Sequence, residues 1–378
     1  MTEENHRVAI IAGDLNGKTV THAALSLHDA LRPALNRGID FTDVPYDSDY
    51  FNQKDITELG DEELTFLRGF DQIFLGAVGD PTKIKPGVME VGLLLKIRQA
   101  FDQYVNLRPV ILPEGVPSII VGKDHHDINF EICRENSEGL YVHEGKVVNR
   151  DTDDEYAEQV MRCSYRGIKR LTDFALGRAR ARSPKPRLHF VFKTNILTDA
   201  AVPWKRVEDE TREANPDVDV RYMHIDNFMM QMITNPRQFD VVVTENMFGD
   251  ISTDLGAVIQ GGIGTAVSGN INPTGEYPSM FEPIHGSAPD KWYETDKKTG
   301  EYVEASWRKR VELVQRIRPE AAFMSYAMML DQMQEKTAAQ IMRNAALNNI
   351  RDPNYKKKSC DDLVEQAQDY IEKEARAA

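Results

Sequence analysis

The feature that most constrains the fold is an alternation of strand-like and helix-like segments through the first hundred residues. Short apolar runs at residues 7–12 and 71–76 are each followed by a longer segment with helical spacing, at residues 21–37 and 91–104. Parallel strands need such crossovers, because the chain must return to the same end of the sheet before the next strand begins. The sequence therefore predicts an α/β fold with a large, mostly parallel sheet covered by helices.

The middle of the chain has a different pattern. Short β-rich runs dominate between residues 107 and 147, including 118–121 and 139–142, and a long helix is expected at residues 154–182. Further strands and helices are expected at residues 188–192, 204–215, 240–244 and 321–335. The change of pattern indicates a second structural region inside the chain.

At 378 residues the chain exceeds the usual size of a single domain. We expect a discontinuous arrangement, in which residues 1–105 plus 265–378 form a large domain around a smaller central α/β domain at residues 106–264. The composition, with 41% hydrophobic and 28% charged residues, is that of an ordinary globular protein.

Composition also argues against several classes of protein. The net charge of −14 argues against nucleic-acid binding, which usually depends on a basic surface. The longest apolar runs, such as residues 241–243, are far too short to span a membrane. The N-terminus lacks the features of a signal peptide, and three widely spaced cysteines suggest a reducing compartment. We therefore expect a cytoplasmic protein.

Two aspartates four residues apart, Asp250 and Asp254, follow a polar turn and open a predicted helix. At 3.6 residues per turn, both carboxylates lie on one helical face. Like charges held this close repel unless a cation lies between them, so one interpretation is a divalent metal site. The alternative is a helix start that Asp250 caps while Asp254 faces water. Asp226 is a third potential ligand, although a lone aspartate is more often a cap or a turn residue.

Three arginines, a tyrosine and a lysine are candidates for substrate chemistry. A guanidinium group binds carboxylates bidentately, so Arg98, Arg108 and Arg134 suit a dicarboxylate, with surface salt bridges as the alternative. Tyr141 is either a proton donor or a buried structural tyrosine. Lys193 lies where an apolar strand ends, where partial desolvation would lower its pKa toward that of a general base; a surface lysine is the alternative.

Glycine-rich phosphate loops are not supported. The loop Gly13-Asp-Leu-Asn-Gly17-Lys-Thr has three residues between its glycines, whereas the Walker A motif needs four. No G-x-G-x-x-G fingerprint follows any predicted strand. A dinucleotide would therefore have to bind in another way.

Six motifs occur in order along residues 8–330: Leu75-Gly-Ala-Val-Gly-Asp-Pro81, residues 92–98, Phe101-Asp-Gln-Tyr-Val-Asn-Leu-Arg-Pro109, Arg134-Glu-Asn-Ser-Glu-Gly139, residues 246–254, and Glu282-Pro-Ile-His-Gly-Ser-Ala-Pro-Asp290. Together they resemble the β-decarboxylating dehydrogenase family, which includes isocitrate, isopropylmalate, homoisocitrate and tartrate/D-malate dehydrogenases. The motifs at residues 101–109 and 134–139 are most similar to the tartrate/D-malate branch.

The resemblance implies an isocitrate/isopropylmalate dehydrogenase-like fold and NAD-dependent oxidation of a D-malate- or tartrate-like 2-hydroxy dicarboxylic acid, coupled to β-decarboxylation. One alternative is an isopropylmalate, isocitrate or specialised-metabolite analogue, including a phosphono acid. The apolar residues 91–95, which line the substrate's variable group in relatives, disfavour the extra carboxylate of isocitrate. A non-catalytic regulatory relative is a further alternative.

The resemblance also assigns ligands for the substrate and a metal. It gives the substrate carboxylates to Arg98, Arg108 and Arg134, and Mg2+ or Mn2+ to Asp226, Asp250 and Asp254. Oxygen-only ligands suit such hard cations. Lys193 would accept the hydroxyl proton, and Tyr141 would protonate the enolate. Because Lys193 and Asp226 would come from the partner subunit, a homodimer with shared sites is implied, and the central domain would carry the dimer contacts.

In the same family the cofactor lies on a loop like that at residues 282–290, so the large domain would bind NAD. The implied contacts are Asn195, Glu282, His285, Gly286, Ser287, Ala288 and Asp290. A carboxylate at Asp290 would repel a 2′-phosphate, which favours NAD over NADP.

Two places depart from the family pattern. The first loop normally reads Gly-Asp-Gly-Ile-Gly-Pro-Glu and approaches the cofactor and substrate, whereas here Leu15, Asn16 and Lys18 interrupt that pattern. The second is an extra segment at residues 291–317, which is predicted to form a hairpin about residues 297–300 and then a helix from Ala305. We expect this segment to rebuild the adenine side of the cofactor site or to cover the cleft; a surface decoration is the alternative.

Overall fold

The computed structural model describes residues 4–296 and 302–377, and these fall into two compact units. Unit 1 comprises residues 1–101, 262–269 and 274–378, and unit 2 comprises residues 102–261 and 270–273. Strand β11 (Val267–Ile271) runs through the boundary, with three residues in unit 1 and two in unit 2. That unit 1 binds the cofactor and unit 2 carries the dimer contacts stays a prediction.

Unit 1 contains the parallel part of the sheet that the N-terminal alternation predicts. The strand order is β2-β1-β3-β12, and each neighbouring pair is parallel. The strands are β1 (His6–Gly13), β2 (Ile39–Asp43), β3 (Gln72–Ala77) and β12 (Ser279–Pro283). The predicted strands at residues 7–12 and 71–76 are thereby confirmed.

One face of this sheet forms the core of unit 1 against helices of the first hundred residues. Ile11 and Leu75 pack there with Phe51, Leu67 and Ile97, all with no exposed surface. The elements are α3 (Ser48–Lys54), α4 (Asp61–Arg68), the π-helix η2 (Glu90–Leu95) and α5 (Lys96–Ala100). Burial of these apolar side chains is the main driving force for this layer.

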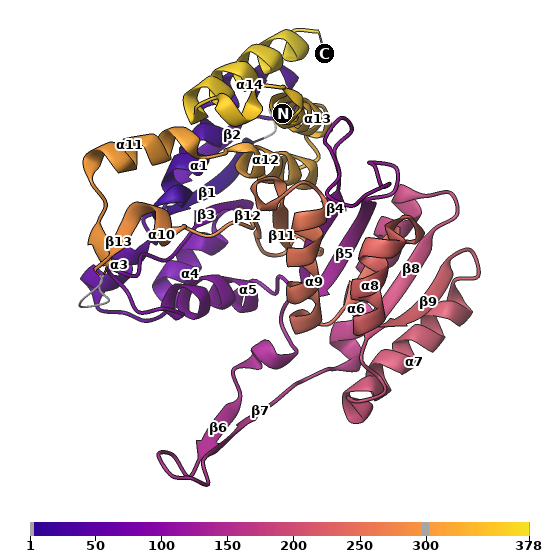
Figure 1. The fold of residues 1–378 in the computed structure, drawn as a ribbon. Coiled ribbons are helices and arrows are strands. Elements are labelled where there is room, and N and C mark those ends of the chain that lie inside the picture. The colour runs from indigo at the N-terminus through magenta and orange to yellow at the C-terminus, as the bar shows by residue number, and fades with distance from the viewer. Residues whose placement is uncertain (1–3, 297–301, 378) are drawn as a thin grey trace. The chain divides into compact units, whose positions relative to one another are not determined.

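The helix predicted at residues 21–37 is wrong in its extent. It is divided into α1 (Asn16–Leu25), α2 (His28–Leu31) and the 3-10 turn η1 (Arg32–Ala34). Pro33 lies in η1, and a proline cannot donate the hydrogen bond that would continue a helix. The C-terminal part of unit 1 contains α12 (Glu320–Gln332), α13 (Lys336–Arg351), η6 (Tyr355–Lys357) and α14 (Cys360–Ala375), shown from orange to yellow in Figure 1.

Unit 2 is a mixed sheet in the order β4-β5-β10-β8-β9. β4 and β5 are antiparallel, and the other neighbours are parallel. The strands are β4 (Val105–Ile111), β5 (Asn129–Glu135), β8 (Arg187–Phe192), β9 (Asp219–His224) and β10 (Val241–Thr244). Ile132, Val191 and Val242 pack with Phe228 and Ile259 in its core.

The helices of unit 2 bring the motif residues to the ends of these strands. They are α6 (Tyr165–Arg182), α7 (Thr198–Ala214), α8 (Ile225–Thr234) and α9 (Asn246–Ile259), with short 3-10 turns η3 (Leu140–Val142), η4 (Pro236–Gln238) and, in unit 1, η5 (Ile263–Thr265). α8 and α9 pack against each other, and α9 packs on β4 and β5.

A two-stranded arm replaces the start of the helix predicted at residues 154–182. β6 (Gly145–Val148) and β7 (Tyr156–Gln159) pair in antiparallel fashion and extend away from the rest of unit 2 (Figure 1). The helix begins only at α6, where the Ser164 side chain accepts the backbone N–H of Gly167 as a cap. The β-rich runs at residues 118–121 and 139–142 form a loop and the turn η3, not strands.

The extra segment of unit 1 has the predicted order of elements. It contains α10 (Pro289–Trp292), the antiparallel pair β13 (Tyr293–Thr295) and β14 (Tyr302–Glu304), and α11 (Trp307–Arg316). The predicted centre of the hairpin, residues 297–300, lies outside the described residues. The helix expected from Ala305 begins at Trp307, because the Ser306 side chain caps it. Across the described ranges, we find no helix with the length and apolar character needed to cross a membrane.

Candidate functional site

Helix α9 begins with a cap that the sequence interpretation did not assign. The Glu245 carboxylate accepts the backbone N–H groups of Met247 and Phe248, at 3.0 and 2.5 Å. Asp250 therefore does not cap the helix, and it lies one turn inside with its side chain 39% exposed. A carboxylate in this position is available for contacts beyond its own helix.

Arg134, at the end of β5, reaches this part of α9. Its guanidinium donates to the Asn246 side-chain oxygen from Nε at 3.0 Å and from Nη2 at 2.6 Å, and Nη1 donates to Asp250. Gly249 makes the approach possible, because a Cβ there would lie 2.4 Å from the Arg134 Cγ. Arg134 itself is 1% exposed, so its charge is compensated almost entirely by these partners.

Two further side chains complete a cluster around Asp250. Arg108 Nη1 donates to the Thr253 hydroxyl at 2.5 Å, and Nη2 lies 3.7 Å from Asp250 Oδ1. The Tyr141 hydroxyl donates to Asp250 Oδ2 at 3.1 Å, and the Arg134 guanidinium lies 5.3 Å from the Tyr141 ring centre. We call Arg108, Arg134, Tyr141 and Asp250 the Asp250 cluster. Two permanent cations share one carboxylate here, which makes the cluster a favourable place for an anion.

The remaining carboxylates of the predicted metal site are not brought together in one chain. Asp254 is exposed one turn after Asp250, and Asp226 is exposed at the start of α8, where it accepts Lys193 Nζ at 2.7 Å. That hydrogen bond lowers the pKa of Asp226. Within the described residues, no group of three or more histidine, cysteine or acidic side chains is arranged to hold a metal ion. The donor chemistry of Asp250 and Asp254 fits part of a site for a hard cation.

Unit 1 holds the third predicted arginine. Arg98, on α5, is 4% exposed, and its Nη2 donates to Glu282 Oε1 at 3.2 Å. The structure therefore brings Arg98 to Glu282, a residue predicted to contact the cofactor, whereas Arg108 and Arg134 meet within unit 2. Asn246 and Thr253, which hold the two arginines of unit 2, were not predicted. Their spacing of four and three residues from Asp250 is the signal that places them on the same helical face.

The predicted cofactor loop follows β12 in unit 1. Burial lowers the pKa of His285, and its Nε2 is buried with no hydrogen-bond partner in the described part of the chain. Ala288 has φ of 55°, and α10 starts after it with Asp290 exposed in its first turn. An unpartnered buried nitrogen and an exposed carboxylate within the same nine residues fit a ligand rich in hydroxyl groups, such as the ribose of a dinucleotide. Asn195, also predicted to contact the cofactor, is exposed in unit 2.

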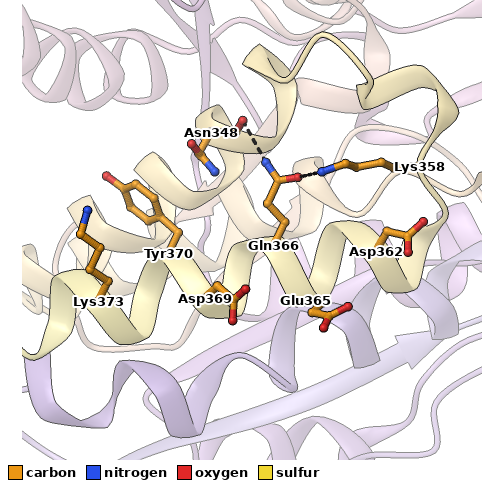
Figure 2. A pocket seen from close by; sticks show the side chains of 8 residues that line it. All are labelled: Asn348, Lys358, Asp362, Glu365, Gln366, Asp369, Tyr370 and Lys373. Atoms are coloured by element: carbon orange, nitrogen blue, oxygen red, sulfur yellow. Dashed lines mark hydrogen bonds between the residues drawn. The ribbon is translucent and has the colours of Figure 1, made fainter.

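The hollow drawn in Figure 2 contains none of the predicted site residues. It lies over α13 and α14 of unit 1, and its side chains carry both signs of charge. Lys358 donates to Gln366, which in turn donates to the Asn348 carbonyl, so these contacts join α14 to the preceding helix. Each unit thus has its own group of candidate residues: the Asp250 cluster in unit 2, and the loop at residues 282–290 in unit 1.

Comparisons with known proteins identify the family of the chain. Residues 7–375 match the model of the isocitrate/isopropylmalate dehydrogenase family. The chain is 41% identical over 335 residues to a 3-isopropylmalate dehydrogenase of Clavibacter sepedonicus, covering 88% of this chain and 87% of the relative. It is 44% identical over 284 residues to the enzyme of that name from Mycobacterium tuberculosis, covering 75% of this chain and 82% of the relative.

A solved structure gives the same result for the fold. The crystal structure of isocitrate dehydrogenase from Methylococcus capsulatus superimposes with a TM-score of 0.80 at 27% identity, covering 97% of this chain and 99% of that one. The expected placement in the tartrate/D-malate branch is wrong, because these relatives at more than 40% identity are 3-isopropylmalate dehydrogenases. The short motifs on which that placement rested are a small part of the matched length. The chain belongs to the isocitrate/isopropylmalate dehydrogenase family of nicotinamide-dependent oxidative decarboxylases.

Proposed function

We propose that this protein oxidises a 2-hydroxy dicarboxylic acid with a substituent at C3, such as 3-isopropylmalate or an analogue of it, and removes its β-carboxylate. The observation that carries the proposal is the Asp250 cluster, in which Arg108, Arg134 and Tyr141 contact one carboxylate. The cluster places two groups that can bind anions and one that can transfer a proton within 3.7 Å of one potential metal ligand.

The protein residues have separate roles in this proposal. Arg108 and Arg134, with Arg98, bind the substrate carboxylates, because a guanidinium group matches a carboxylate in shape and charge. Asp250 and Asp254, with Asp226 of the partner subunit, would hold Mg2+ or Mn2+. When bound, the metal lowers the pKa of the substrate hydroxyl and stabilises the negative charge that decarboxylation creates.

Proton transfer is assigned to Lys193 and Tyr141. Lys193, from the partner subunit, would accept the hydroxyl proton, and a bound nicotinamide would supply the acceptor for the hydride of C2. The β-carboxylate then leaves as CO2, and Tyr141 donates its proton to the carbon that carried it. The hydroxyl of Tyr141 already points to Asp250 Oδ2, so it lies next to the proposed metal ligand.

The substituent at C3 is inferred from two observations. Relatives at more than 40% identity are named for 3-isopropylmalate. In unit 1, Val91 is exposed and lies two turns before Arg98, and Leu94 is half-buried and lies one turn before it. An apolar surface beside a carboxylate-binding arginine favours a hydrocarbon group over the additional carboxylate of isocitrate.

NAD is the proposed cofactor, bound by residues 282–290 together with Asn195. The exposed Asp290 carboxylate would accept hydrogen bonds from ribose hydroxyls of NAD. It would repel the 2′-phosphate of NADP, because two negative charges would be held a few ångströms apart.

A homodimer with shared sites is supported by exposed apolar residues on two neighbouring helices of unit 2. Met230 on α8 and Met247, Ile251 and Val258 on α9 are 39–58% exposed. The three α9 residues recur at helical spacing, which is the pattern of a face that packs against a partner. We expect Ile251→Asp to shift the dimer toward monomer in light scattering and to abolish turnover.

The test is NADH formation on a panel of 3-isopropylmalate, D-malate, tartrate, isocitrate and phosphono analogues, with Mn2+ present or chelated. We expect the highest kcat/KM on a malate with an apolar or bulky C3 substituent, and loss of activity on chelation. Preference for D-malate, tartrate or isocitrate would contradict the proposed substrate class. No turnover on any member would favour the regulatory alternative.

A further inference from the structure

The extra segment of unit 1 contacts the first loop, so the two departures from the family pattern meet in space. Trp292, at the end of α10, donates its indole N–H to the Asn16 side-chain oxygen at 2.8 Å. The next residue, Tyr293, donates its hydroxyl to Asp80 Oδ2 at 2.8 Å. Both aromatic side chains are partly buried. We call Trp292 and Tyr293 the brace.

The first loop has a strained backbone between two tightly held residues. Leu15 has φ of 49° and ψ of −115°, a region that a residue with a Cβ rarely occupies. Before it, Asp14 is buried and accepts the Ser48 hydroxyl at 2.8 Å and the Gly79 N–H at 2.8 Å. After it, Asn16 is held by Trp292. A strained residue persists only where its surroundings fix it, and here they do so on both sides.

The same contacts extend to the loop proposed to bind NAD. The backbone N–H of Asn16 donates to the Ser287 carbonyl at 3.3 Å, and the Ser287 hydroxyl donates to the Gly79 carbonyl at 2.5 Å. The network closes through Asp80, whose N–H donates to the Ser48 hydroxyl at 3.0 Å and whose carboxylate accepts from Tyr293. Burial raises the pKa of Asp80, but donors from Thr82 and Tyr293 outweigh that effect and keep the carboxylate ionised as an acceptor.

We propose that Trp292 and Tyr293 are positioning residues for the dinucleotide: they hold the first loop in its strained conformation against Ser287 and so shape the cofactor site. This inference rests on the proposed function, in which NAD binds at residues 282–290. The extra segment thus replaces a conformational role that the family pattern gives to glycine, because a glycine in place of Leu15 would adopt this backbone conformation without strain.

The test compares NAD binding by Trp292→Phe, Tyr293→Phe and the wild type. Each variant removes one hydrogen-bond donor and keeps an aromatic ring. We expect the Kd and KM for NAD to rise about five- to tenfold, the range for loss of one well-placed hydrogen bond. We expect kcat to stay within about twofold, because neither residue touches the reacting atoms. Trp307→Phe, at a tryptophan that is 74% exposed on α11 of the same segment, is the matched control and should change nothing.

A second comparison separates positioning from general stability. In the Leu15→Gly background the loop no longer needs to be held, so the effect of Trp292→Phe on the Kd for NAD should fall below about twofold. An effect of Trp292→Phe that is equal in both backgrounds, or a Kd unchanged by both brace substitutions in a wild-type background, would overturn the inference alone. A wild-type protein that binds neither NAD nor NADP would overturn the proposed function and the inference together.

Discussion

The two units hold their proposed functional residues in different ways. In unit 2, Arg134 and Tyr141 both contact Asp250; Arg134 and Asp250 belong to motifs of the family, and Tyr141 follows one of these motifs by two residues. In unit 1, Asn16 and Asp80 are held by Trp292 and Tyr293, which belong to a segment that the family pattern lacks. The groups proposed to react with the substrate are therefore held by ion pairs and hydrogen bonds among themselves. A loop that only positions a ligand can instead be held in place by an additional segment of the chain.

The largest effect predicted from this comparison of the two units is that of replacing Asp250 in unit 2. Asp250→Asn should lower metal-dependent turnover by about 1,000-fold or more, equivalent to about 4 kcal/mol, because a neutral amide is a poor ligand for Mg2+ or Mn2+. The fold should persist, since the amide oxygen still accepts from Arg134 and the amide NH2 can donate to the Tyr141 hydroxyl oxygen. Turnover and Mn2+ affinity by titration calorimetry are the measurements, with circular dichroism to verify the fold.

The control is Asp217→Asn, which removes an exposed carboxylate of unit 2 that pairs with Arg180. Its turnover and Mn2+ affinity should match the wild type. Mn2+ affinity unchanged in Asp250→Asn would show that the carboxylate only neutralises the arginines, and the Asp250 cluster would then be a structural ion pair.

Tyr141 provides the next largest effect. Tyr141→Phe removes the proposed proton donor and keeps the ring that lies beside Arg134. We expect kcat to fall about 100-fold, a typical value for loss of a general acid, and the KM values to change only a few-fold. Tyr156→Phe, at a half-exposed tyrosine on the arm of unit 2, is the control. A kcat within twofold of wild type in Tyr141→Phe would remove the tyrosine from the mechanism.

The two units also differ in how they bury a histidine, and this difference affects the free energy of unfolding. His189, in β8 of unit 2, is fully buried, and neither ring nitrogen has a hydrogen-bond partner in the described residues. In unit 1 the buried His28 is paired with the Tyr326 hydroxyl at 2.8 Å. Burial, with the nearby charges of Arg221 and Arg187, lowers the pKa of His189 to about 4.

The sign of the pH effect follows from that shift. The unfolded chain binds the proton near pH 6.5, whereas folded His189 stays neutral until about pH 4, so its contribution to stability is lost as the pH falls through this window. At pH 5 the loss is on the order of 2 kcal/mol. The free energy of unfolding in urea should therefore fall less between pH 7 and 5 in His189→Leu than in the wild type. The exposed His22, replaced in the same way, is the control, and an equal fall in all three proteins would contradict the prediction.

The buried strands were the elements that the sequence predicted most accurately. The apolar runs of β1, β3, β8 and β10 lie in the predicted places, because a buried parallel strand is recognisable from a short stretch of the chain. The arm was predicted only in part: the β-rich runs expected up to residue 147 include most of β6, whereas β7 was assigned to the start of a helix. The four residues of β7 are exposed, pair only with β6 and carry no apolar periodicity that would distinguish them from a helix.

The candidate site was predictable as a list of residues and less so as a set of contacts. Arg134 and Asp250 were both named, but their contact depends on Gly249, whose role is visible only once the Arg134 side chain is placed. The partnership of Trp292 with Asn16 joins residues 276 positions apart, and no local pattern encodes it. The proposed substrate class rests on similarity over most of the chain, because the two short motifs at residues 101–109 and 134–139 indicated the wrong branch.

Asp290 provides the smallest of the expected effects and the sharpest test of how unit 1 differs from unit 2. Asp290→Ser should raise the KM for NAD about tenfold and improve the relative use of NADP, because it removes both an acceptor for the ribose hydroxyls and a charge that repels the 2′-phosphate. The control is Asp369→Ser, an exposed aspartate of unit 1 that lines the hollow in Figure 2. If Asp290→Ser leaves the preference for NAD unchanged while Trp292→Phe weakens it, cofactor recognition in this protein depends mainly on the braced first loop. Unit 1 would then differ from the family pattern in how the dinucleotide is recognised, and unit 2 would keep the chemistry of the family.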